Sequence, residues 1–248
     1  MSGEREKPLI LCYHKIDTRL ELGFTRLGPH AFRRQMESLV PLTAHRSPLT
    51  ITFDDGYEAL DRHAFPVLEE LGLTAVVFVI TDFAGRDNSW DVQYGGLSFP
   101  LLTWDQLGRW QERGVISVQS HTKTHARLTW VSDAQAADEL AGSREEIRRR
   151  LGTDAAAISY PFGAVDERVK RLAREAGFTT GYAGPRATGA DPMELARRAV
   201  YAWDTFAPPL VSREGAAGGL ARGVARLTNA FAVGTSLFQK VAGSRYAR

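Results

Sequence analysis

Seven apolar runs with the spacing of β-strands recur along the chain, and helix-like segments separate most of them. The runs are LILCYHKI (9–16), LTITFDDG (49–56), LTAVVFVI (73–80), VISVQSHT (115–122), AAISYPFG (156–163), TTGYAG (179–184) and RRAVYAW (197–203). Several are apolar on both faces, which is typical of parallel strands covered by helices. Seven such units in 248 residues favour a closed or nearly closed barrel, with an open doubly wound sheet as the alternative.

We therefore predict an α/β fold, a distorted (β/α)7-type barrel of parallel strands with outer helices. Helices are expected at 30–40, at 103–114 with Thr103 as N-cap, at 132–152, and from Tyr57 to Leu71, where apolar residues follow helical spacing. Trp104 and Trp110 at helical positions are expected in the core. The loop 81–102 is rich in turn formers and aromatic residues, and long loops in compact domains tend to be functional.

The composition is that of an ordinary soluble protein, with 44% hydrophobic and 24% charged residues. The net charge of +2 is too near neutral to indicate a nucleic-acid partner. Cys12 is the single cysteine, so an intrachain disulfide is excluded, and we expect it to be a small buried hydrophobe. The amino terminus has no secretion-signal core and no segment is long enough for a bilayer, so a cytoplasmic or membrane-peripheral location is expected.

The sequence pattern changes after the double proline at 208–209. We expect a barrel domain at residues 1–207 and a C-terminal amphipathic helical extension at 208–248, with Leu220, Val224, Leu227 and Phe231 on one face. Packing of this helix on or beside the barrel is favoured, and contact with a membrane surface or with a partner are the alternatives. The sequence does not indicate an oligomeric state.

Two adjacent acids, Asp54 and Asp55, end one of the strand runs. One aspartate, with Gly56 in a tight turn, could cap the following helix. A second carboxylate beside the first adds repulsion and desolvation cost, which a cation or a proton-transfer role can offset. The pair therefore indicates chemistry at the carboxyl end of a strand.

His121 and His125 follow another strand run and share one face if the segment continues as a helix or helical loop, with surface polarity as the alternative. In a parallel barrel the carboxyl ends of all strands lie on one face, where sites are built. Two imidazoles and one carboxylate make a metal site with open positions, and the second aspartate can then take a proton from water. The predicted chemistry is hydrolysis of an amide or ester.

The segments TFDDGY (52–57), SHTKTH (120–125) and YPFG (160–163) resemble, in order, the first three motifs of the polysaccharide deacetylase family, the NodB-like carbohydrate esterases. The resemblance covers about residues 8–204. It implies a distorted (β/α) barrel, a divalent metal, usually Zn²⁺, and removal of N-acetyl or O-acetyl groups from sugars. Co²⁺, Ni²⁺ and Fe²⁺ accept the same ligands.

The resemblance also implies a role for each matching residue. Asp54 corresponds to the general base, and the metal ligands correspond to Asp55, His121 and His125. The groove-wall motif, in which the backbone N–H of Phe162 helps to hold the oxyanion, corresponds to Tyr160, Pro161, Phe162 and Gly163.

Two family features are missing. Ser159 stands where many members have an arginine that orders the catalytic aspartate, and the late Leu-x-His motif is absent because no histidine follows His125. His14 ends the first strand, so barrel geometry would place it on the same face as the metal. Its Tyr-His context resembles the poly-N-acetylglucosamine deacetylase branch, so we predict His14 as the general acid. A structural histidine is the alternative. The brief connection 41–49 predicts a thinned or open barrel wall.

The loop 81–102 resembles the aromatic cap of the same branch. Trp90 offers a stacking face for a sugar ring and Asp91 a partner for a hydroxyl, and further candidates for substrate contact are Asn88, Tyr57 and Arg198. Arg198 and Asp204, which flank the last run, are also candidates for ordering the site.

We predict a metal-dependent hydrolase that removes acetyl groups from N-acetylated amino sugars in a polysaccharide or oligosaccharide. The second interpretation is an amidase or deformylase acting on a small or lipid-linked sugar or a natural-product amide. The third is a catalytically inactive carbohydrate-binding module.

Overall fold

The computed structural model describes residues 8–19, 25–44, 49–91, 97–185, 187–202 and 204. The extension predicted at 208–248 lies outside these residues. Within the described ranges, no helix combines the length and the apolar character that crossing a membrane requires.

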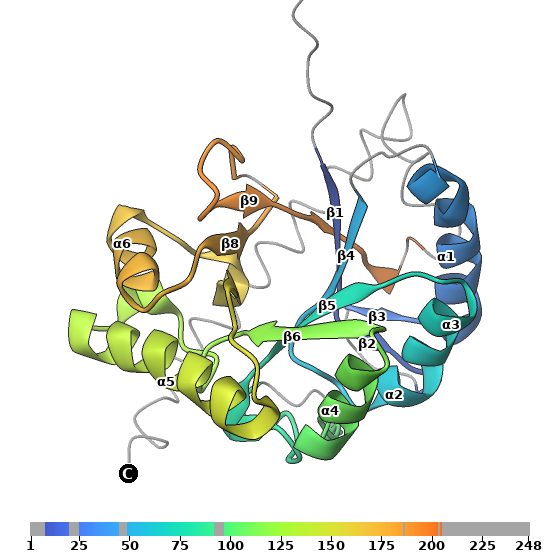
Figure 1. Ribbon diagram of the computed structural model, residues 1–248, viewed down its shortest axis with the longest axis horizontal. Helices are drawn as coiled ribbons and strands as arrows, with labels where there is room; N and C mark the ends of the chain where they lie inside the picture. Colours follow the sequence, from blue (N-terminus) through green and yellow to red (C-terminus); the bar gives the residue numbers. More distant parts are fainter. Residues whose placement is uncertain are drawn as a thin grey trace, which may run out of the picture.

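One parallel sheet of eight strands forms the centre of the molecule (Figure 1). Its strands, in spatial order, are β10 (Arg198–Ala199), β1 (Leu9–Tyr13), β4 (Leu49–Phe53), β5 (Ala75–Val79), β6 (Ile116–Ser120), β7 (Ala157–Ser159), β8 (Thr180–Ala183) and β9 (Leu195–Ala196). Only Arg197 separates β9 from β10 in the chain, yet β9 pairs with β8 and β10 pairs with β1. The segment 195–199 therefore joins the two edges of the sheet and closes the barrel except for the break at Arg197.

The predicted barrel of parallel strands is confirmed, and each of the seven predicted runs contributes a strand to it. The last run differs from the prediction, because pairing begins two residues earlier, at Leu195, and is interrupted at Arg197. A separate two-stranded parallel pair, β2 (Lys15–Ile16) with β3 (Arg26–Leu27), lies outside the barrel sheet.

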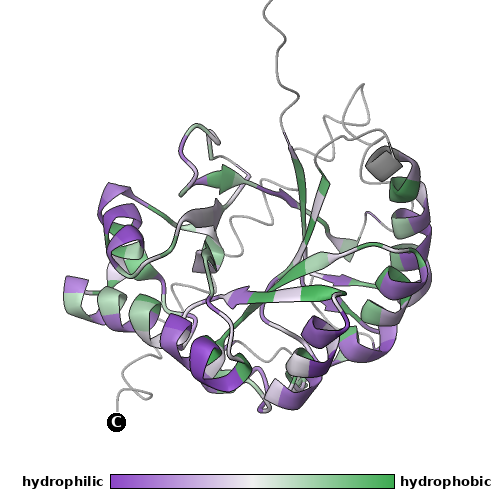
Figure 2. Cartoon of the chain, viewed as in Figure 1, coloured by the Kyte–Doolittle hydropathy of each residue, from purple (hydrophilic) through white to green (hydrophobic). Residues whose placement is uncertain are grey.

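Helices surround the sheet on its outer side: α1 (Pro29–Ala44), α2 (Ala59–His63), α3 (Phe65–Glu70), α4 (Trp104–Glu112), α5 (Asp133–Leu151) and α6 (Glu167–Glu175). Apolar residues colour the strands and polar residues the outward sides of these helices (Figure 2). Thr103 and Ser132 each form a complete capping box, which explains why α4 and α5 begin where the sequence predicts. Gly152, with a φ of 67°, ends α5 in the left-handed conformation that glycine favours.

Two details of the sequence prediction are wrong. The helix expected from Tyr57 to Leu71 is split into α2 and α3 at Ala64, because Pro66 lies at the start of α3 and disfavours helical continuation before it. The barrel wall after the short connection is not thinned, since β1 and β4 pair over five residues from Leu9↔Leu49 to Tyr13↔Phe53. The shortest pairing in the described sheet is instead between β6 and β7, where Ser120↔Ile158 is the one aligned pair.

The core lies inside the barrel and between the sheet and the helices. Tyr13, Phe32 and Phe53 form a buried aromatic group there, with ring centroids 5.4 to 5.8 Å apart. Trp110 is buried against Phe65 and Trp104 packs against the same core, as predicted. This packing fixes the strands whose carboxyl ends carry the polar residues described next.

Candidate active site

Polar side chains that follow two strands meet at one end of the barrel. Asp54 and Asp55 follow β4, and His121 follows β6. The backbone N–H of Asp54 donates to the carbonyl of Tyr13, and that of His121 donates to the carbonyl of Val79, so the strand pairing continues into the site. These residues are therefore held by the barrel rather than by mobile side-chain contacts.

Asp55, His121 and His125 bring one potential ligand atom each to within 4.8 Å of the others. The Oδ1 atom of Asp55 lies 3.5 Å from Nε2 of His121 and 3.7 Å from Nε2 of His125. Two ligands that share a tetrahedral zinc ion at about 2.1 Å would lie about 3.4 Å apart. The donor set and its spacing thus fit a divalent ion, and the predicted convergence of these three residues is confirmed.

Strained backbone is concentrated at this site. The described part of the chain holds four non-glycine residues with positive φ: Asp55 (68°), Thr122 (69°), His125 (64°) and Phe162 (61°). Residues other than glycine adopt this conformation at a cost, and such residues cluster where a side chain must be aimed for function. All four belong to the segments that converge here.

The two histidines are brought together by a loop, not by the helical spacing that the sequence suggested. Thr122 and His125 are both left-handed, and the threonine hydroxyl accepts a hydrogen bond from the His125 N–H at 3.1 Å. Glu139 of α5 anchors the loop, because its Oε2 accepts the N–H groups of Lys123 and Thr124, both at 2.9 Å. Glu139, which the sequence analysis missed, thus holds the turn between the histidines.

The ring of His121 is oriented by its neighbour across the β6–β7 seam. Its Nδ1 lies 2.7 Å from the carbonyl oxygen of Ser159. A carbonyl only accepts, so Nδ1 carries the proton and Nε2 presents its lone pair towards Asp55. Burial lowers the pKa of His121, and burial, followed by the closeness of the His121 ring, lowers the pKa of His125 well below the usual value. Both rings are therefore neutral, which is the form that binds metals.

Asp54 is held by a buried arginine. Nη1 of Arg197 donates to Oδ1 and Nη2 to Oδ2, both at 2.7 Å, and the same Nη2 donates to Oγ of Ser159 at 2.8 Å. Ser159 in turn donates to Oδ2 at 3.2 Å. Arg197 and Asp54 are 6% and 4% exposed, so the pair is desolvated and its bidentate geometry fixes the carboxylate plane.

The two neighbouring aspartates have opposite electrostatic surroundings. Burial acts to raise the pKa of Asp54, but Arg197 and, after it, His121 together hold that pKa well below its usual range. Burial, followed by the charge of Asp54, raises the pKa of Asp55 well above its usual value. Asp55 is therefore the carboxyl group that a nearby cation would ionise, whereas Asp54 is already kept ionised by its protein neighbours, chiefly Arg197.

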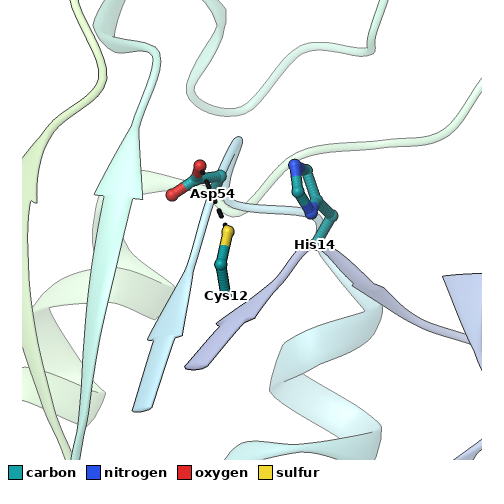
Figure 3. Close-up of side chains that lie close together, drawn as sticks. All are labelled: Cys12, His14 and Asp54. Atoms are coloured by element: carbon teal, nitrogen blue, oxygen red, sulfur yellow. Dashed lines mark hydrogen bonds between the residues drawn. The ribbon is translucent and has the colours of Figure 1, made fainter. Parts of the chain in front are cut away.

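Cys12 and His14 flank Asp54 on β1 and just beyond it (Figure 3). The Cys12 thiol donates to Oδ2 of Asp54 at 3.6 Å. Cys12, His14 and Asp54 could themselves offer three ligand atoms within 4.8 Å. The charge of Asp54 is already paired with Arg197, and burial raises the pKa of Cys12, so we interpret this group as a neutral thiol and imidazole around a paired carboxylate.

His14 is placed as the sequence predicts but is neutral. Its Nδ1 is buried without a hydrogen-bond partner among the described residues. Burial lowers the pKa of His14 to about 4. A proton donated by His14 at neutral pH must therefore first arrive from another group, and the carboxyl group of Asp54 lies beside it.

The groove-wall motif is divided between surface and core. Phe162 is left-handed and partly exposed, and its ring lies 4.8 Å from the ring of His125. Gly163 packs so closely that an added Cβ would lie 2.6 Å from the backbone nitrogen of Gly184. Pro161 and Tyr160 are buried, and Tyr160 has no exposed surface, so its prediction as a groove residue is wrong because its ring fills the core.

The aromatic cap is partly at the site and partly structural. The Trp90 ring lies 5.9 Å from the ring of His125, and the charge of Asp91 reaches Asp55. Asn88 and Tyr57 are both 3% exposed, and their role as substrate contacts stays a prediction. Asn88 accepts the N–H of Phe99 at 2.8 Å and closes the loop, while Tyr57 packs under Trp90.

A sequence profile of the family described as polysaccharide deacetylase matches residues 42–181. The chain belongs to the polysaccharide deacetylase family. The matched span contains the two aspartates, the two histidines and the Pro-Phe-Gly turn, but neither His14 nor Arg197.

Three relatives illustrate the similarity. YxkH of Bacillus subtilis, itself only provisionally named a polysaccharide deacetylase, is 28% identical over 71% of this chain and 65% of its own length. A poly-beta-1,6-N-acetyl-D-glucosamine N-deacetylase of Staphylococcus epidermidis is 27% identical over 52% of this chain and 46% of its own. The chain thus spans less than two thirds of either. The fold matches Streptococcus pyogenes deacetylase PplD, solved with acetate, with a TM-score of 0.66 at 22% identity over 79% of this chain and 92% of PplD.

In this member of the polysaccharide deacetylase family, the arginine missing from the third motif is replaced from another strand. Arg197 of the closing segment 195–199 makes the contact, whereas the sequence analysis named Arg198. Successive side chains of a strand point to opposite faces, so Arg198 points away from Asp54, and its charge acts on Tyr13 instead. Asp204 does not order Asp54 either, since its Oδ2 accepts the N–H of Tyr201 at 2.8 Å.

Proposed function

We propose that this chain is a metal-dependent hydrolase that removes acetyl groups from N-acetylated amino sugars of a glycan. The observation that carries the proposal is the convergence of Asp55, His121 and His125 beside an Asp54 that Arg197 keeps ionised. Membership of the polysaccharide deacetylase family supports it. The Staphylococcus relative named for poly-beta-1,6-N-acetyl-D-glucosamine indicates the class of substrate, and the acetate bound to PplD indicates the product.

Asp55, His121 and His125 would hold the ion, and two imidazoles with one carboxylate favour zinc among the common divalent metals. When bound, such an ion supplies Lewis acidity towards the acyl oxygen and lowers the pKa of water. The fixed Nδ1–H of His121, donated to Ser159, leaves Nε2 free to bind it.

Asp54 takes the proton of the attacking water. Its carboxylate is ionised at neutral pH and its plane is fixed by Arg197, so it is ready to accept without reorganisation. The water oxygen forms a bond to the acetyl carbon, and the carbon–nitrogen bond then breaks. The backbone N–H of Phe162 donates to the acyl oxygen while that oxygen carries negative charge.

The leaving amine needs a proton. His14 supplies it in our proposal, after receiving the proton that Asp54 took from water, because His14 is neutral in the resting site. The balance is then complete: one water and one amide give acetic acid and a free amino group. Return of the proton directly from Asp54 is the competing route.

Release of acetate from chitooligosaccharides, from β-1,6-linked N-acetylglucosamine oligomers and from small acetylated sugars tests the function. We expect activity with zinc, loss on chelation, and a loss of at least about 10³-fold in kcat for Asp54→Asn with unchanged metal content. Turnover of small or lipid-linked amides alone would favour an amidase or deformylase, and glycan binding without any acetate release would favour an inactive module.

A second assay separates the two proton routes. Phenyl acetates with a good leaving group need no proton on departure, so His14→Gln should hydrolyse them nearly as fast as the unmodified protein while losing amide hydrolysis. Equal losses on both substrates would exclude His14 as the acid.

A further inference from the structure

Trp130 is an exposed indole on the face of the barrel that carries the site. It ends the short helix η3 (Leu128–Trp130) in the loop between β6 and α5, and the loops after the strands line the active face of a parallel barrel. Its side chain is 43% exposed. Single exposed apolar residues are ordinary, so its neighbours decide whether this one matters.

Those neighbours form a continuous row that ends at a candidate metal ligand. The guanidinium carbon of Arg127 lies 4.5 Å from the Trp130 ring centroid and 5.7 Å from that of Phe162. The Phe162 ring lies 4.8 Å from the ring of His125. The Phe162 ring, the Arg127 guanidinium and the Trp130 indole thus lead outward, one contacting the next, from His125. We call this set, Trp130, Arg127 and Phe162, the outer platform.

We propose that the outer platform is a subsite for a second pyranose ring, next to the ring that loses its acetyl group. The inference rests on the proposed deacetylase function and names its substrate class as an oligosaccharide or polysaccharide chain. The exposed face of an indole suits the apolar C–H face of a pyranose. The planar guanidinium of Arg127 lies over one face of the Trp130 ring and adds positive charge to the same surface.

A second aromatic group contacts the same histidine. Trp90, whose ring is 5.9 Å from that of His125, packs on Phe83 and Tyr57. The reacting sugar therefore has the cap beside it, and the chain continues over the outer platform. A monosaccharide would contact the inner part of this surface and leave Trp130 unused.

Two measurements on the zinc-loaded protein test the subsite. The first is kcat/KM for acetate release from N-acetylglucosamine oligomers of one to five units. The second is calorimetric binding of the tetramer in an Asp54→Asn background. We expect Trp130→Ala to lower tetramer kcat/KM and affinity about three- to tenfold, as one stacked ring implies, and to leave the monomer unchanged. Trp130→Phe should retain part of the effect.

Arg150→Ala is the matched control, because Arg150 lies over Trp104 on the outer helices at 5.9 Å and away from the strand ends. It should behave as the unmodified protein on every substrate. Equal tetramer binding by Trp130→Ala and by the control, or no binding of any oligomer, would overturn the subsite. Absence of acetate release by the unmodified protein would instead overturn the proposed function, and the binding measurement would still decide on the platform.

Discussion

Replacement of Arg197 by alanine should leave Asp54, the proposed base, without its main hydrogen-bond donor. The change removes two 2.7 Å contacts to Asp54 and one 2.8 Å contact to Ser159. Removing one partner of a buried ion pair typically costs about 3–5 kcal/mol, because the other charge stays desolvated. Ser159 and Cys12 still donate to the carboxylate, so we expect the lower end, about 3 kcal/mol of unfolding free energy.

The same argument sets the size of the catalytic effect. If the loss of the Arg197 contacts raises the activation free energy by the same amount, about 3 kcal/mol, kcat/KM falls about 10²-fold, since each 1.36 kcal/mol is tenfold. The pH profile should also move. Arg197 holds the pKa of Asp54 below its usual range, so its removal raises that pKa, and the acidic limb of kcat/KM shifts to higher pH. Lysine has a single compact charge and cannot bind both carboxylate oxygens at once. Arg197→Lys should therefore have a kcat/KM between those of the unmodified protein and Arg197→Ala.

Arg198→Ala is the control, because the next side chain of the same segment points to the other face and acts on Tyr13. Acetate release by zinc-loaded protein gives kcat/KM, and urea unfolding followed by tryptophan fluorescence gives stability. Metal content is measured in parallel. The reasoning fails if Arg197→Ala and Arg198→Ala have kcat/KM values within about twofold of each other at equal metal content.

Three further predictions concern other parts of the fold. Gly163→Ala should cost about 2 kcal/mol or more of unfolding free energy, because the new Cβ would clash with backbone 2.6 Å away. Gly72 has a similar φ but open space around it, so Gly72→Ala should lower the free energy of unfolding less in the same urea titration. Glu139→Ala should weaken zinc binding about 10- to 100-fold in chelator competition, because it releases the loop between His121 and His125. Glu145→Ala, at an exposed position of the same helix, should leave zinc affinity unchanged. Equal zinc affinities of the two variants would refute the role of Glu139. Hydrogen bonds from an arginine of α6 lower the pKa of Asp191 to about 2 from 3.8, so its stabilisation is present above pH 3.8 and lost as pH falls towards 2. Asp191→Asn should flatten that part of the stability profile, and an unchanged acid slope in urea unfolding would contradict it.

The barrel could be predicted from the sequence because its signals are local. Each strand carries its own apolar pattern, and the caps at Thr103 and Ser132 are encoded within four residues. The two aspartates and the two histidines follow strands directly, so parallel topology alone was enough to bring them to one face. The family motifs then added roles that local patterns do not contain.

What the sequence did not reveal depends on contacts between distant residues. Arg197 and Asp54 are 143 positions apart, and the pair Arg197 and Arg198 carries no sign of which side chain points inward. The missing arginine at Ser159 was the available signal, because it left a buried carboxylate without its partner. Exposure is equally non-local, and Tyr57, Asn88 and Tyr160 have the residue types of a sugar site yet lie inside the protein.

The position of Arg197 couples the closure of the barrel to its chemistry. β9 pairs with β8 and β10 pairs with β1, so the segment 195–199 is the piece that joins the two edges of the sheet. The break between these strands is the residue whose side chain turns inward to Asp54. An arginine at position 159 of the third motif would hold Asp54 from β7, independently of closure. Here the paired contacts of Arg197 with Asp54 form only when the last strand is in place, so local opening of this segment would remove that support while the rest of the barrel stays folded.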